Sequence, residues 1–65
     1  MKIKYIDCYF NSNHSIFFMV GIEGVTEITI ERVNGNIKGF RIYKENKLYK
    51  QIKCQNFIIE YFNQE

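Results

Sequence analysis

Few side chains in this sequence have the types and spacing that chemistry requires. The chain contains one aspartate, Asp7, one histidine, His14, and two serines, Ser12 and Ser15. His14 lies close to both serines, but neighbours in a polar turn do not hold a general base in the orientation that a nucleophile needs. The sequence therefore predicts no catalytic residue, and we expect that the protein is not an enzyme.

The two cysteines are the remaining candidates for a metal or redox site. Cys8 and Cys54 are far apart in the sequence and form no CxxC pair, the spacing typical of zinc ribbons and redox motifs. Cys8, His14 and Cys54 would supply three ligands only if the fold brought them together. We therefore expect no metal ion and no other cofactor. Reduced thiols are the simpler interpretation of the cysteines, and a disulfide between them stays open as the alternative.

Positive charge gathers in the second half of the chain, whereas the first half is slightly acidic. Glu23, Glu27 and Glu31 precede a row in which a basic residue recurs at every third position. Successive side chains of a strand point to opposite faces, so strands divide this row between two faces. The basic row consists of Lys38, Arg41, Lys44, Lys47, Lys50 and Lys53.

One face of the last hairpin then combines cations with tyrosines. Tyrosine and arginine carry much of the binding energy at protein interfaces. Arg41 is expected to lie opposite Tyr49 and to stack on its ring. If this surface does not bind the partner, the exposed apolar side of residues 16–22, around Phe17 and Met19, is the alternative. The predicted partner-binding residues are Arg41, Tyr43, Lys47, Tyr49 and Lys53.

Two functions fit such a surface. The first is a small non-enzymatic binding protein, an inhibitor or regulator that acts by contact with another protein. The alternative is a single-stranded nucleic-acid-binding module, in which tyrosines stack on bases and cations neutralise phosphates. The net charge of +2 is small for a nucleic-acid-binding domain, and cross-strand ion pairs with Glu27 and Glu31 would neutralise part of this face. Another protein is therefore the expected partner, with nucleic acid and a second copy of the chain as alternatives.

Composition points to one small β-rich domain spanning residues 1–65. Of the 65 residues, 46% are hydrophobic and 17% aromatic, and the chain has no proline or tryptophan. β-Branched and aromatic residues favour strands. The longest apolar run, residues 16–22, is too short to cross a bilayer, so we expect a cytoplasmic protein without a membrane partner. The many Ile, Lys and Asn residues indicate an AT-rich coding sequence, as in a phage or mobile-element accessory protein.

Turn-forming residues divide the chain into strands. Residues 2–10 and 25–33 alternate between apolar and polar side chains or are rich in β-branched ones. Residues 16–22 are apolar at both the odd and the even positions. A strand that is apolar on both faces is typical of the middle of a covered sheet, so residues 16–22 are expected to lie there. Two further strands are expected on either side of a turn at residues 44–46.

Two three-residue hairpin loops are predicted, over residues 34–36 and 44–46. The first loop sets Ile30 opposite Phe40. It also sets Ile28 opposite Ile42, so that apolar partners share one face. The second loop sets Ile42 opposite Leu48 by the same argument. The core predicted from these two registers consists of Ile16, Phe18, Val20, Ile28, Ile30, Phe40, Ile42, Leu48 and Ile52.

The hydrophobic pattern changes after Cys54. Apolar residues between positions 57 and 62 recur at helical spacing, which predicts a short amphipathic C-terminal helix there. A sixth strand over the same residues is the alternative. The predicted fold class is mainly β, a small α+β domain with a five-stranded, curved antiparallel sheet or small barrel that the helix covers.

Overall fold

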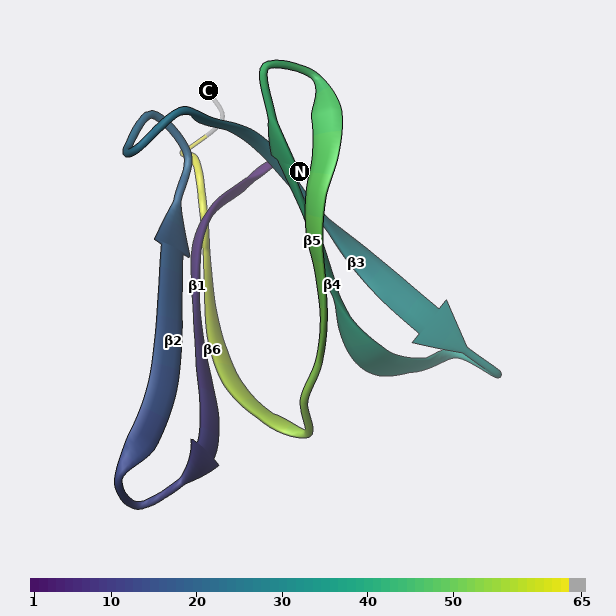
Figure 1. The fold of residues 1–65 in the computed structure, drawn as a ribbon. Helices are drawn as coiled ribbons and strands as arrows, with labels where there is room; N and C mark the ends of the chain where they lie inside the picture. Colours follow the sequence, from purple (N-terminus) through teal and green to yellow (C-terminus); the bar gives the residue numbers. More distant parts are fainter. Residues whose placement is uncertain (64–65) are drawn as a thin grey trace.

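The computed structural model describes residues 1–63, which form six β-strands in two sheets (Figure 1). Sheet A has the strand order β2-β1-β6 and sheet B the order β3-β4-β5, and every pairing is antiparallel. No helix that could span a membrane occurs within these residues. The strands are β1 (Ile3–Asn11), β2 (His14–Met19), β3 (Val25–Val33), β4 (Asn36–Lys44), β5 (Lys47–Lys53) and β6 (Asn56–Tyr61).

The β-rich class is confirmed, but the single five-stranded sheet and the C-terminal helix are wrong. Residues 56–61 form β6, which pairs with β1, so the alternative of a sixth strand holds. Side chains alternate along β6 between partly buried and exposed, as a strand with one face on the core requires. Phe62, which completed the helical pattern, lies beyond the strand, and its N–H donates to the carbonyl oxygen of Lys2 at 2.9 Å.

The strand expected in the middle of the sheet lies at its edge instead. β2 pairs with β1 alone among residues 1–63, and β1 is the central strand of sheet A. Ile16 and Phe18 of β2 pack against the core, which explains one of its apolar faces. On the other face Phe17 is 52% exposed. The predicted helix that was to cover this face does not exist among the described residues.

The hydrophobic core lies between the two sheets. Phe40 of sheet B is fully buried, and its ring packs edge-on against Phe57 of sheet A with centroids 5.2 Å apart. Of the predicted core residues, Ile28, Phe40, Ile42 and Ile52 are buried, and Ile16, Phe18, Val20 and Ile30 are partly buried against them. Leu48 is the exception, with 54% of its surface exposed. The core residues that the sequence reasoning missed are Ile3, Ile6, Cys8, Val25 and Cys54.

The first hairpin has the predicted register but builds it differently. Ile28 lies opposite Ile42 and Ile30 opposite Phe40, as expected. The loop, however, has two residues, Asn34-Gly35, both in the left-handed region, which is the geometry of tight hairpin turns. Close to this turn, β4 carries one extra residue, Lys38, as a bulge between the pairs Arg32–Ile37 and Glu31–Gly39. A two-residue turn plus one bulge residue has the same effect on the register as a three-residue loop.

In the second hairpin the predicted register is wrong. Its loop is also a two-residue turn, Glu45-Asn46, with both residues in the left-handed region. Leu48 therefore lies opposite Tyr43 on the outer face of sheet B, and this explains its exposure. The extra residue enters as a bulge at Tyr49, so that Ile42 lies opposite Lys50.

The two cysteines meet in the core. Both are buried and free, Cys8 in sheet A and Cys54 just after β5. Burial, with a further contribution from the neighbouring Cys54 thiol, raises the pKa of Cys8 from 9.0 to about 12. The folded state therefore holds Cys8 as a neutral thiol well above the pH at which it ionises in an unfolded chain.

This pKa predicts that stability falls in alkali. A thiol whose pKa is higher in the folded state stabilises the fold fully below pH 9.0, and this contribution is lost as the pH rises from 9.0 toward about 12. The urea midpoint should therefore drop between about pH 8 and about pH 10.5. The Cys8→Ala variant starts from a lower midpoint and should drop less over the same interval. Equal drops in both proteins would show that other groups cause the alkaline loss.

Candidate binding surface

The structure separates the five residues predicted to bind a partner. Arg41 and Tyr43 belong to the outer face of sheet B, since they alternate along β4 with the buried Phe40 and Ile42. Lys53 belongs to the same face because it lies opposite Gly39. Arg41 is already engaged, because its Nη2 lies 2.8 Å from Oε2 of Glu31. This contact confirms that a cross-strand glutamate neutralises part of the basic face.

Tyr49 and Lys47 lie elsewhere. Because of the bulge in β5, the residue opposite Arg41 is Gln51, so the expected stack of Arg41 on Tyr49 is wrong. The Tyr49 ring instead approaches Phe18 of sheet A, with centroids 6.5 Å apart, and Lys44 Nζ lies 4.0 Å from its centroid. Lys47 lies opposite Lys44 beside the turn.

The outer face of sheet A brings exposed apolar side chains from three strands together. Its central row comes from β1, and the flanking residues come from β2 and β6 through the cross-strand pairs of those strands. Phe17 and Ile58 are 52% and 50% exposed, on opposite sides of β1. We call this surface the aromatic face and define it by Tyr5, Asp7, Tyr9, Phe17, Met19 and Ile58.

Contacts within the aromatic face hold its side chains in place. The rings of Tyr5 and Phe17 pack together with centroids 5.3 Å apart. The Tyr9 hydroxyl donates a hydrogen bond of 2.9 Å to Oδ2 of Asp7, and this bond raises the pKa of Tyr9. Asp7 lies opposite Phe17 on one side and Ile58 on the other, so the carboxylate sits among apolar neighbours. Within residues 1–63 it forms no ion pair.

The outer face of sheet B has the opposite character. There Glu31 accepts hydrogen bonds from Arg41 at 2.8 Å and from Gln51 at 2.6 Å, which links all three strands. A polar outer face of this kind is the usual surface of an antiparallel sheet that has water on one side. The aromatic face departs from this rule in part, because exposed or half-buried aromatic and aliphatic side chains stand there beside Asp7 and Glu60.

Sequence reasoning identified only part of the aromatic face. Phe17 and Met19 were the alternative to the predicted basic surface, whereas Tyr5, Asp7, Tyr9 and Ile58 were missed. The available signal was the pair of neighbouring segments, residues 2–10 and 16–22, that both carry aromatic side chains at the outward positions. A covering helix was expected to hide one apolar side.

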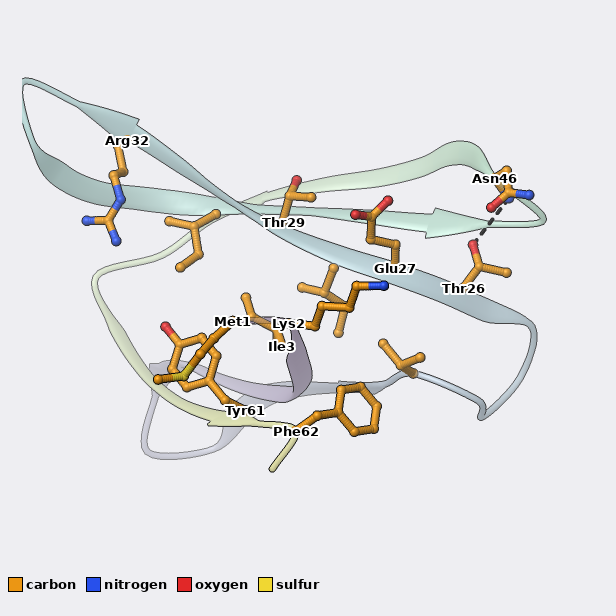
Figure 2. Close-up of a pocket in the computed structure, with 13 residues that line it drawn as sticks. Met1, Lys2, Ile3, Thr26, Glu27, Thr29, Arg32, Asn46, Tyr61 and Phe62 are labelled. Atoms are coloured by element: carbon orange, nitrogen blue, oxygen red, sulfur yellow. Dashed lines mark hydrogen bonds between the residues drawn. The ribbon is translucent and has the colours of Figure 1, made fainter. Parts of the chain in front are cut away.

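A groove of about 950 Å³ opens between β3 and the adjoining ends of β1 and β6 (Figure 2). Ile3, Ile28 and Tyr61 contribute to its apolar part, and Figure 2 shows Arg32 at one end. Its charged lining residues are Lys2, Glu27 and Arg32. Cations and an acid line the same groove, so its charge selects no class of ligand.

Metal-ligand geometry and the comparisons with known proteins add no further site. Within residues 1–63, no three His, Cys, Asp or Glu side chains come together as ligands for a metal ion. Compared with protein-family models, with curated proteins and with solved structures, the chain matches none.

Proposed function

We propose that this chain is a small non-enzymatic binding protein, an inhibitor or regulator that acts by protein–protein contact through its aromatic face. The observation that supports this function is the exposure of Tyr9, Phe17 and Ile58 on the side of sheet A that sheet B does not cover. The centres of protein interfaces are rich in Tyr, Phe and Met and poor in charged residues. The aromatic face has much of this composition, with Asp7 near its centre and the exposed Glu60, opposite Tyr5, as the second charge at its border.

Asp7 defines what the partner must present. Covering the aromatic face would remove water from a carboxylate that has one hydrogen bond, from Tyr9, and no ion pair within the described residues. Burial of an unpaired charge is strongly unfavourable, whereas a cation placed against it offsets the loss of water. We therefore expect an apolar partner surface that carries an arginine or lysine facing Asp7.

Two lysine substitutions test this surface. Ile58→Lys places a charge on the aromatic face, and Leu48→Lys places the same charge at a similarly exposed aliphatic residue on the outer face of sheet B. The immobilised full chain is used to capture proteins from the source cells, and the captured protein is then purified and titrated. Ile58→Lys should weaken its binding by about tenfold or more, because a buried charge is added at the interface.

The control keeps this result specific to one face. Leu48→Lys should leave the dissociation constant within about twofold of the original chain, since surface substitutions remote from an interface have small effects. Thermal unfolding of both variants checks that each is folded. Weakening by Leu48→Lys with no change in Ile58→Lys would contradict the proposal and move the binding surface to sheet B.

A single-stranded nucleic-acid-binding function is the second proposal, and one observation favours it. Lys47, Lys50 and Lys53 are exposed along the edge strand β5, which contains no acidic residue. Phosphate contacts of these lysines would make affinity fall steeply with salt. Fluorescence anisotropy with a labelled oligothymidylate at low and at physiological salt distinguishes this function, because a protein-binding module should leave the anisotropy unchanged at both.

A further inference from the structure

The edge strand β2 lacks the features that keep sheet edges from pairing. Natural edge strands carry charges or proline, which prevent another strand from adding to them. Of the four edge strands in this structure, β3, β5 and β6 all contain Lys, Arg or Glu. β2, His14–Met19, contains none of these and no proline. Figure 1 shows β2 at the outside of sheet A, with β1 beside it on one side.

The hydrogen bonds between β1 and β2 show which backbone groups of β2 face the open edge. Val20 N–H donates to the Lys4 carbonyl at 2.9 Å, in the same register as the β1–β2 ladder. In an antiparallel ladder, hydrogen-bonded pairs alternate with pairs whose N–H and C=O groups point away. Ser15, Phe17 and Met19 are therefore the residues whose backbone faces outward. Of these groups, the Met19 carbonyl already accepts a hydrogen bond from Ile22 N–H at 3.1 Å.

From these observations we infer that β2 pairs with β2 of a second copy of this chain, antiparallel and about a twofold axis at Phe17. This register places Phe17 opposite Phe17 of the second copy, and both present outward-facing backbone groups. It sets Ser15 opposite Met19 of the second copy, so all three outward-facing residues of each strand take part, and the Met19 carbonyl oxygen accepts a second hydrogen bond beside that from Ile22 N–H. Ile16 then lies opposite Phe18 of the second copy, on the inner side.

The second copy fits this edge because the pairing is self-complementary. A twofold axis brings identical patches together, so any charge near the axis would face its own copy. The same pairing through β5 would bring lysines together, and β2 has no such residue. The result is a six-stranded sheet in which the two aromatic faces are continuous. Edge pairing leaves these faces open, so the dimer is independent of the proposed partner binding.

Sedimentation equilibrium of the full chain over a wide concentration range tests the dimer. Phe17→Lys places two lysines opposite each other at the axis and removes the ring contact, so the dimerisation constant should fall by about tenfold or more. Ile58→Lys makes the same change at the other edge of sheet A, with matched exposure, and should leave dimerisation unchanged while it weakens partner binding. A monomeric original chain at all concentrations, or equal effects of the two variants, would overturn the inference.

A cysteine variant tests the register without adding charge. In a hydrogen-bonded antiparallel pair, the two Cα atoms are about 5.5 Å apart, within the range that a disulfide spans. A mild thiol oxidant should therefore convert Phe17→Cys rapidly to a covalent dimer, in which the two thiols lose two protons and two electrons to the oxidant. Ile58→Cys should cross-link much more slowly, whereas equal rates would contradict the pairing at Phe17.

Discussion

Phe40→Ala should lower the free energy of unfolding by about 3–5 kcal/mol, the usual loss when a buried phenylalanine is truncated to alanine. Phe40 has no exposed surface, and its ring packs edge-on against Phe57 at 5.2 Å. Because Phe40 belongs to sheet B and Phe57 to sheet A, this contact joins the two sheets. Small domains have a total stability of about 5 kcal/mol at the low end, so most of the folded population should be lost.

Urea unfolding followed by circular dichroism measures this effect. We expect Phe40→Ala to show a greatly lowered midpoint or no cooperative transition. Phe17→Ala is the matched control, because it removes the same side chain from a half-exposed position whose main ring contact is with Tyr5. It should lose about 1 kcal/mol. Similar losses in the two variants would mean that the core does not lie between the sheets at Phe40.

Gly39→Ala should lower the free energy of unfolding by about 3 kcal/mol, the upper part of the usual range for overpacking. A Cβ atom at Gly39 would lie 1.9 Å from the carbonyl oxygen of Ile52. The obstacle is the backbone of β5, which cannot rotate away as a side chain can. β5 would have to separate from β4, so the hydrogen bonds of this pair should weaken as well.

Gly35→Ala separates this steric effect from the general cost of replacing a glycine. Nothing lies within 4 Å of a Cβ at Gly35, but its φ of +83° is left-handed, so alanine should cost about 1–2 kcal/mol through backbone strain. Hydrogen exchange provides the second measurement. Gly39→Ala should speed exchange of the β4–β5 amides, and Gly35→Ala should not. A Gly39→Ala protein as stable as the original chain would contradict the close approach of β5.

The hairpins show what a single sequence can predict about register. In the first, alternating apolar residues on both strands determine which side chains share a face, so the pairing of Ile30 with Phe40 was predictable. In the second, the extra residue entered at Tyr49, whose ring approaches Phe18 of the other sheet. The bulge thus coincides with a contact between the two sheets. The alternation of residues within one hairpin carries no information about such a contact.

The C-terminal strand and the exposure of the aromatic face escaped prediction for a related reason. Residues 57–62 fit both a helical and a strand pattern, and the free edge of β1 decides between them by offering a pairing partner. Once a helix was expected to cover the sheet, the two apolar sides of residues 16–22 were attributed to a strand covered on both faces. Without the helix, one of these sides belongs to the exposed aromatic face.

Amide chemical shifts of the isotope-labelled chain, titrated with the purified partner, test the central claim most directly. We predict that the largest shifts occur in sheet A, at Asp7, Phe17, Ile58 and their neighbours, with small changes along β5. Binding through the aromatic face requires this distribution, because shift changes report proximity to the partner. Largest shifts along β5 (Lys47–Lys53) with sheet A unchanged would contradict the account.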